Sequence, residues 1–221
     1  MERHFDDALQ GLKNKLLDMG GLAEAMIHDA VNALIAHNPG LLEVIPAKEE
    51  KVNRLQVEID EACLCLIARH QPTASDLRLL LGIAKINSDL ERLGDHAVNI
   101  AGTVTRLLAE PQLKPFVIIP EMVKVASGMV KDSLHAFLAR DTRQAREILQ
   151  RDHLLNEARD RITLELQDYM ARDPNAIARG VLLIIVARNL ERIGDLAKNI
   201  CEDVIFVAEG RDIRHGHAKP G

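Results

Sequence analysis

The chain has 221 residues, and its 28 Lys and Arg against 33 Asp and Glu give a formal net charge of −5 at pH 7. Proteins that bind nucleic acid need a basic surface for the phosphates and often aromatic side chains for stacking on bases. This chain has no basic excess, and its aromatic residues are four Phe and one Tyr. We therefore expect no nucleic-acid partner.

Cysteine use and hydropathy indicate the compartment in which the protein works. The three cysteines, Cys63, Cys65 and Cys201, cannot all pair, and this count fits a reducing compartment better than a secreted domain. The first residues of the chain are charged and contain no apolar signal core. The longest strongly apolar stretch, 180–187, is far shorter than the ~20 residues of a membrane-spanning helix. We expect a cytoplasmic protein without a membrane-inserted segment.

Helical periodicity runs through almost the whole chain. Between Leu79 and Leu107, apolar residues recur in alternating steps of three and four, which is typical of one buried helix face. No segment shows the strict alternation of a half-buried strand, so the sequence predicts an all-α fold. Short breaker clusters divide the chain into six predicted helices, over residues 3–37, 47–70, 74–109, 116–139, 142–171 and 174–209.

The third and sixth predicted helices contain the same motif. Residues 90–100 read LERLGDHAVNI and residues 190–200 read LERIGDLAKNI, so eight of eleven positions are identical. Agreement of this density within one chain indicates an internal duplication. We therefore predict a tandem repeat of two three-helix bundles, over residues 1–112 and 113–221, with the boundary in the stretch 111–115 and a short tail at the end.

Each copy of the motif places two carboxylates on one face of its helix, because they are four residues apart. The turn before each copy pairs its helix with the preceding helix in antiparallel fashion. That pairing sets a further acidic residue and an asparagine at the same height. The first cluster then comprises Glu49, Asn53, Glu91 and Asp95, and the second cluster comprises Asp152, Asn156, Glu191 and Asp195.

We expect these carboxylates to face outward, roughly opposite the apolar stripe. Three carboxylates and an amide repel one another unless a cation or protons neutralise them. All-oxygen sites suit Mg²⁺, Ca²⁺, Mn²⁺ or iron rather than a thiolate-type structural zinc. The competing interpretation is a solvated helix face, since Glu and Asp four residues apart are common on exposed helices. Both copies also contain a glycine, Gly94 or Gly194, which costs a helix about 1 kcal/mol relative to alanine and so predicts a close approach of the neighbouring helix.

Four features of the sequence belong together: Val57-Glu-Ile-Asp-Glu-Ala-Cys63, Gln71-Pro-Thr-Ala-Ser-Asp-Leu-Arg78, both ERxGD copies, and Arg214-His215 near the C-terminus. With these motifs the chain resembles, from end to end, the PhoU family, the accessory proteins of bacterial phosphate-specific transport systems. The resemblance implies two three-helix bundles in a cytoplasmic homodimer that protein partners recruit to the inner membrane.

The resemblance also implies a function and a ligand set. It implies a negative regulator of the phosphate-starvation response that bridges the phosphate ABC transporter and a sensor histidine kinase. The acidic motifs of some members hold surface metal clusters, and magnesium, manganese, iron and zinc all stay open as the ion here. Two residues depart from the full pattern, because Asn53 and Asn156 stand where a carboxylate can occur. The family pattern carries over to Glu49, Glu91, Asp95, Asp152, Glu191 and Asp195.

Three classes of function compete for this sequence. The leading prediction is a non-enzymatic adaptor that regulates phosphate uptake through protein contacts. A metal-dependent hydrolase using the acidic clusters is the main alternative, although the clusters are predicted on convex faces without a recessed pocket or a general base. A phosphate or metal sink is the third class, and no glycine-rich phosphate loop or arginine cluster in the sequence supports it.

Overall fold

The structure is a computed structural model that describes residues 2–213, with side chains from residue 5 onward. The Arg214-His215 pair of the family pattern lies outside the described residues. Every regular element within residues 2–213 is a helix and none is a strand, which confirms the all-α fold. The elements are α1 (Glu2–Ala36), η1 (Pro39–Leu42), α2 (Ile45–His70), α3 (Ala74–Leu108), α4 (Ile118–Ala139), α5 (Thr142–Leu149), α6 (Asp152–Arg172), η2 (Pro174–Ala176) and α7 (Ile177–Glu209).

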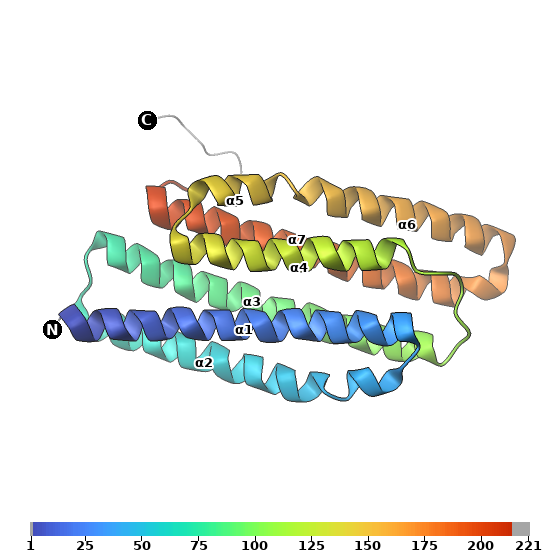
Figure 1. The fold of residues 1–221 in the computed structure, drawn as a ribbon, viewed down its shortest axis with the longest axis horizontal. Helices are drawn as coiled ribbons and strands as arrows, with labels where there is room; N and C mark the ends of the chain where they lie inside the picture. Colours follow the sequence, from blue (N-terminus) through green and yellow to red (C-terminus); the bar gives the residue numbers. More distant parts are fainter. Residues whose placement is uncertain (1, 214–221) are drawn as a thin grey trace.

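Two antiparallel three-helix bundles lie side by side (Figure 1). The first bundle consists of α1, α2 and α3, and the second consists of α4, α6 and α7, with the short α5 packed on α4 and α7. In the view of Figure 1, α1 and α4 lie in front of α3 and α7, while α2 and α6 form the outer edges. The antiparallel helices α3 and α7 make the most extensive contact of any helix pair, so the two repeats share a long seam.

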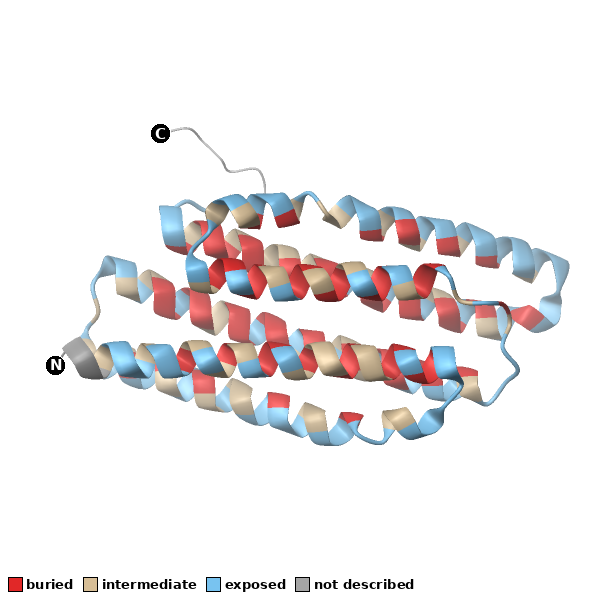
Figure 2. Ribbon diagram, viewed as in Figure 1, coloured by how far each residue is buried: buried red, intermediate tan, exposed pale blue. Residues whose placement is uncertain are grey.

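The predicted apolar stripes form the core. Along α3, the side chains of Leu79, Ile83 and Leu90 are all buried, and the buried faces of the helices point toward one another (Figure 2). Burying one such side chain stabilises the folded state by roughly 1.5–3 kcal/mol. The apolar stripe therefore explains which face of α3 is buried. The apolar residues are spread over stripes, and none of the helices in residues 2–213 is long and apolar enough to cross a membrane.

One predicted helix is interrupted. The sequence predicts a single helix over residues 142–171, but a two-residue turn separates α5 from α6. No Gly or Pro marks this turn. Instead, Arg151 at the turn forms an ion pair with Asp132 of α4, and Arg146 of α5 pairs with Glu209 at the end of α7. These tertiary contacts accompany the break, and the boundaries of the other five helices differ from prediction by at most three residues.

The two repeats are joined by the segment 109–117, which contains the predicted boundary at residue 112. The buried hydrophobic side chains of the two bundles form one continuous core, because α1 also packs on α4 and α3 packs on α7. Independent folding of residues 1–112 and 113–221 therefore stays a prediction.

Candidate functional site: two acidic clusters and the seam between the repeats

The two motif glycines are contact points between helices. A Cβ atom on Gly94 would lie 3.3 Å from Cγ1 of Val52 in α2, and one on Gly194 would lie 2.2 Å from Cδ1 of Leu155 in α6. Val52 and Leu155 are both buried, so neither side chain has free space behind it. The predicted close approach is confirmed, and with it the helix pairing on which the two clusters depend.

Lys198 joins the two helices that carry the second cluster. Its Nζ lies 2.9 Å from Oδ2 of Asp152 in α6 and 3.2 Å from Oδ1 of Asp195 in α7. Burial acts to lower the pKa of Lys198, but its hydrogen bonds and charge interactions with the two carboxylates outweigh burial and raise that pKa. The lysine is therefore a charged cross-link between α6 and α7 at neutral pH.

Arg159 joins the same two helices at the other end of the second cluster. Its Nη1 donates to Oε1 of Glu191 in α7 at 2.7 Å and to Oδ1 of Asn156 in α6 at 3.3 Å. The Nδ2 of Asn156 donates in turn to Oδ2 of Asp152 at 3.0 Å. Hydrogen bonding to Asp160 and the charge of Glu191 raise the pKa of Arg159 against the opposing effect of burial. This arginine and the lysine together contact all four residues of the second cluster.

The first cluster has the same framework without such cations. The positions that correspond to Arg159 and Lys198 are Gln56 in α2 and Val98 in α3, and both are neutral. Within residues 5–213, no Lys, Arg or His forms an ion pair with a carboxylate of the first cluster. The two clusters therefore differ in what neutralises them.

Two carboxylates of the first cluster, Glu91 and Asp95, repel one another. Burial and the charge of Asp95 raise the pKa of Glu91, and the nearby charge of Arg92 opposes them. Across the helix pair on α2, Glu49 is half-buried and Asn53 is exposed. The cluster thus gathers negative charge on a surface that is open on one side.

The expected outward orientation is correct for Asp95 and wrong for the two motif glutamates. Glu91 and Glu191 are half-buried, and only 17% of the Glu191 side chain is exposed. The reason is that α2 packs beside Glu91 on α3, and α6 packs beside Glu191 on α7. Asp95 lies one turn further along α3 and is exposed, while half of the Asp195 side chain is exposed.

Neither cluster contains a preformed metal site. Within residues 5–213, no three His, Cys, Asp or Glu side chains converge on one point. In the second cluster, one buried carboxylate oxygen, Oδ1 of Asp152, has no hydrogen-bond partner. The carboxylates of this cluster already bond Lys198 and Arg159, and one free buried oxygen does not satisfy Mg²⁺ or Mn²⁺, which take about six ligands. The second cluster therefore does not fit the predicted ion, and a metal ion at the first cluster stays a prediction.

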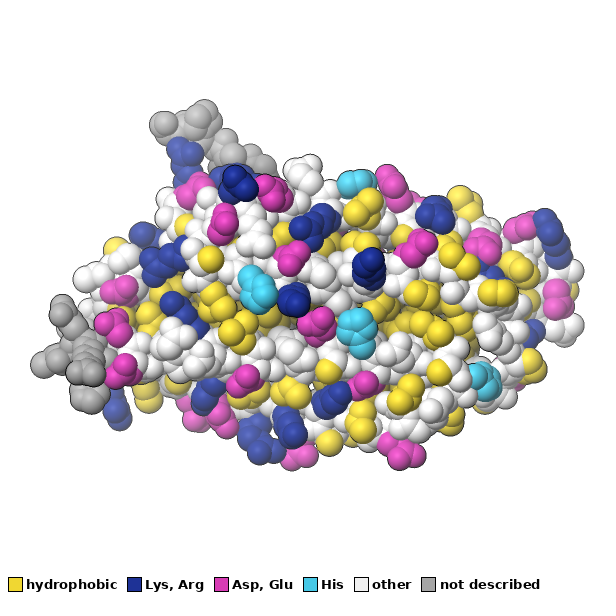
Figure 3. All heavy atoms as spheres, viewed as in Figure 1, with side chains coloured by type: hydrophobic (Ala, Val, Ile, Leu, Met, Phe, Trp, Pro, Cys, Tyr) yellow, Lys and Arg dark blue, Asp and Glu magenta, His cyan; other side chains and the backbone are white. Residues whose placement is uncertain are grey.

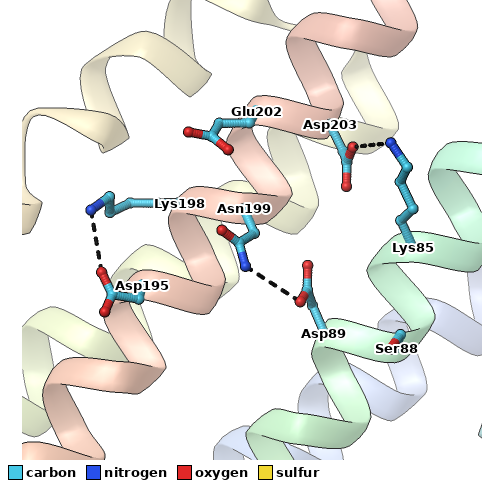
Figure 4. A pocket seen from close by; sticks show the side chains of 8 residues that line it. All are labelled: Lys85, Ser88, Asp89, Asp195, Lys198, Asn199, Glu202 and Asp203. Atoms are coloured by element: carbon cyan, nitrogen blue, oxygen red, sulfur yellow. Dashed lines mark hydrogen bonds and ion pairs between the residues drawn. The ribbon is translucent and has the colours of Figure 1, made fainter. Parts of the chain in front are cut away.

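A polar groove of about 550 Å³ runs along the seam between α3 and α7. Lys85 of α3 pairs with Asp203 of α7 at 3.1 Å, and Asn199 of α7 donates to Asp89 of α3 at 3.5 Å (Figure 4). Asp195 and Lys198 of α7, which bond each other, also line this groove (Figure 4). The pairs between α3 and α7 link the two repeats and occupy several of the polar groups that line the groove.

Asp89 is the most informative residue of this seam, because it is a carboxylate that is only 8% exposed. Burial raises its pKa to about 6, against the opposing hydrogen bonds from Asn199 and Arg92. The corresponding residue of the second repeat is Asn189, whose Oδ1 lies 2.9 Å from Nδ1 of His96. Both repeats send a polar side chain into the seam, but one of them is ionisable and the other is neutral.

A second groove, of about 420 Å³, lies next to the first. Because α3 and α7 are antiparallel copies of one sequence, equivalent positions meet here around a local two-fold axis. The lining residues are Arg92, Asp95, His96 and Asn99 of α3 and Arg192, Asp195, Leu196 and Asn199 of α7.

All three cysteines are free thiols, and none of them belongs to either cluster. Cys63 and Cys201 are buried, and burial raises the pKa of each thiol to about 12. Cys65 is exposed, because two residues along a helix turn the side chain to another side.

Sequence reasoning missed three functional side chains, namely Lys198, Arg159 and Asp89. Lys198 follows Asp195 by three residues and Arg159 follows Asn156 by three, a spacing that places side chains on the same helix face. That spacing was the available signal for both cations. Asp89 interrupts the apolar face of α3, and its burial depends on α7, which the local pattern does not describe.

Comparison with known proteins assigns the family. The family model described as the PhoU domain matches the chain twice, over residues 16–104 and 119–204. The chain belongs to the PhoU family. A phosphate-specific transport system accessory protein PhoU homolog of Pseudomonas putida is 38% identical to this PhoU-family chain over 216 residues, which cover 97% of the chain and 84% of that protein. The phosphate-specific transport system accessory protein PhoU of Escherichia coli is 33% identical over 211 residues, covering 96% and 88%.

Solved structures of PhoU proteins share the fold. The crystal structure of PhoU from Pseudomonas aeruginosa has a TM-score of 0.89 at 38% identity and covers 94% of this chain and 100% of that one. The phosphate transport system regulatory protein PhoU from Streptococcus pneumoniae has a TM-score of 0.87 at 31% identity, with coverage of 95% and 99%. The PhoU fold therefore extends over both repeats of this chain.

Proposed function

We propose that this PhoU-family chain is an accessory protein that regulates a phosphate-specific transport system through protein contacts, without catalysing a reaction. The observation that carries this proposal is the similarity, over both repeats, to proteins named as phosphate transport accessory or regulatory proteins. The more detailed role is an adaptor that touches the phosphate ABC transporter and a sensor histidine kinase, and that holds the kinase quiet when phosphate is plentiful.

The α1–α4 face offers a surface suited to protein contacts. Acidic and basic side chains alternate over it, and hydrophobic side chains show between the two helices (Figure 3). A groove of about 330 Å³ lies between α1 and α4, and of its apolar lining residues Ile35 is 43% exposed while Val31 and Val123 are buried. Exposed apolar side chains among charged ones are common at protein–protein contacts. This face supports docking of a partner on two helices that carry no residue of the acidic clusters.

The seam grooves support an adaptor rather than the alternative metal-dependent hydrolase. Several of their charged side chains already pair within the chain, as Lys85 does with Asp203 and Lys198 with Asp195. A hydrolase needs an activated nucleophile or a general base directed into a substrate pocket. The pairings favour a structural role for these carboxylates.

Sedimentation with membrane vesicles tests the adaptor. Vesicles that contain the phosphate ABC transporter should carry the protein into the pellet, and vesicles of the same lipids without it should not. At a net charge of −5, anionic lipid repels the protein, so recruitment depends on a protein partner. Equal binding to both vesicle types would contradict the proposal, and so would metal-dependent phosphatase turnover that is lost in Asp95→Asn.

Two further measurements test the partners. Autophosphorylation of the sensor kinase, reconstituted with the transporter, should fall when the protein is added and should recover when the transporter is left out. Light scattering should give twice the chain mass of 24.5 kDa if the protein is the homodimer that we propose. Inhibition of the kinase without the transporter would contradict the bridging role.

A further inference from the structure

The acidic residues of the two clusters stand at equivalent positions of the two repeats, but the clusters differ in net charge. Each cluster contains three carboxylates and one asparagine. The second cluster adds Lys198 and Arg159, which neutralise two of its three negative charges. The first cluster has Val98 and Gln56 at those positions and gains no charge compensation from them.

We propose that Lys198 and Arg159 take the place of a metal ion in the second cluster, so that the contact between α6 and α7 is independent of divalent cations. This inference does not rest on the adaptor function, since it concerns the contents of the cluster and not its partners.

Lys198 occupies the position of a bridging cation. Its ammonium group bonds Asp152 and Asp195, which come from different helices, at 2.9 and 3.2 Å. A divalent ion that joined the same two helices would need these same oxygens at about 2.0–2.6 Å. The ammonium and the ion therefore compete for one place, and the ammonium is tethered to it.

Arg159 occupies two further ligand oxygens. It uses Oε1 of Glu191 and Oδ1 of Asn156, which is the one oxygen that the asparagine could offer to a metal ion. The amide nitrogen of Asn156 already donates to Asp152. Each of the four cluster residues therefore already bonds Lys198 or Arg159, and the one fully buried oxygen without a partner, Oδ1 of Asp152, does not by itself make a divalent-ion site.

Partial burial keeps this arrangement in place. The Asp152 and Glu191 side chains are each 17% exposed, while Lys198 and Arg159 are 30% and 29% exposed. Charges that are screened little by water interact strongly, so an incoming divalent ion is repelled by both resident cations. Metal binding would require Lys198 to leave two carboxylates at once.

The test counts Mn²⁺ bound to the metal-free full chain, from the electron paramagnetic resonance signal of the free ion. The double variant Asp152→Asn and Asp195→Asn should bind the same number of Mn²⁺ ions as the wild-type protein. Lys198→Val together with Arg159→Gln copies the residues of the first repeat into the second, and this variant should bind additional Mn²⁺. Mn²⁺ should also raise the melting temperature of the Lys198→Val and Arg159→Gln variant more than it raises the melting temperature of the wild-type protein, because only the variant binds the ion at the second cluster.

The matched control is the reverse exchange, Val98→Lys with Gln56→Arg, which places the same two cations in the first repeat and should add no Mn²⁺ site. Circular dichroism confirms that each variant is folded. Where the double variant does not fold, Lys198→Gln removes the charge alone and should also bind additional Mn²⁺. Loss of Mn²⁺ in the Asp152→Asn and Asp195→Asn variant would overturn the proposal, as would a folded Lys198→Val and Arg159→Gln protein that binds no more Mn²⁺ than wild type.

Discussion

The two repeats show how one motif can support two different electrostatic sites. Both copies keep the glutamate, the aspartate and the glycine, and both pack against the preceding helix through that glycine. Two positions make the difference. One is Val98 or Lys198 within the motif, and the other is Gln56 or Arg159 on the neighbouring helix. The motif fixes where the carboxylates lie, whereas its neighbours decide whether the protein or the solvent supplies the counter-charge.

The seam between the repeats shows a second difference of the same kind. Asp89 of α3 and Asn189 of α7 occupy equivalent positions, and only the aspartate can ionise. The two repeats thus place polar side chains at equivalent positions of the seam, but only the side chain of the first repeat can gain or lose a proton. Substitutions that exchange residues between equivalent positions are therefore the most direct way to test the comparison.

The largest effect is expected for Lys198→Met, which keeps the aliphatic stem and removes the charge. It should lower the free energy of unfolding by about 2–3 kcal/mol, because Asp152 and Asp195 lose their shared partner and Asp152 is mostly buried. Urea denaturation at pH 7 measures this change. The matched control is Val98→Met at the equivalent position of the first repeat, which should change stability by less than about 1 kcal/mol. Equal effects of the two substitutions would contradict the comparison.

A smaller gain in stability is expected for Asp89→Asn, which makes the first repeat resemble the second. At pH 7.5 the buried carboxylate is charged, and replacing it should raise the free energy of unfolding by about 1–2 kcal/mol. Burial raises the pKa of Asp89 from 3.8 to about 6. Between these two pH values the folded state binds more protons than the unfolded state, so this group stabilises the fold as the pH falls.

The pH dependence makes the Asp89→Asn prediction specific. Its advantage over wild type should be full above pH 6 and should shrink toward pH 4, as the wild-type carboxyl becomes protonated in the folded state. Denaturation series at several pH values give the two profiles. Asn189→Asp at the equivalent position serves as the reciprocal variant and should lower stability at neutral pH. Parallel profiles for wild type and Asp89→Asn would show that burial does not control this group.

The smallest effects concern the two aspartates of the motif, and they should have opposite signs. Asp95→Asn removes a charge that repels Glu91 and should raise the free energy of unfolding by about 0.5 kcal/mol. Asp195→Asn removes a partner of Lys198 and should lower it by a similar amount, about 0.5 kcal/mol. Thermal melts at low ionic strength measure both, and added salt should reduce both shifts. Shifts of the same sign would mean that the two clusters are electrostatically alike.

The fold could be predicted because its signals are local and repeated. The apolar spacing from Leu79 to Leu107 shows which face of α3 is buried. The motif glycines indicated the contacts with Val52 and Leu155, because a glycine inside a helix needs a packing reason. In the second repeat the antiparallel register is borne out, because Lys198 and Arg159 connect the cluster residues across α6 and α7.

The features that escaped prediction depend on contacts between segments far apart in the sequence. The turn between α5 and α6 contains no breaker residue, and Arg151 in this turn pairs with Asp132 of another helix. Burial of Asp89 requires α7, which lies about one hundred residues away along the chain. Glu91 and Glu191 are half-buried because the neighbouring helix covers them, and an isolated helix model places them in solvent.

The unequal exposure of the three thiols gives experimenters a built-in attachment point. Cys63 and Cys201 are buried and stay protonated at neutral pH, since the pKa of each thiol is about 12. The thiolate is the reactive form, so a maleimide reagent modifies the native protein at Cys65 on α2. A fluorophore or spin label there marks the outer edge of the first bundle without any cysteine being replaced. The unmutated chain can therefore carry one label per molecule at a defined place.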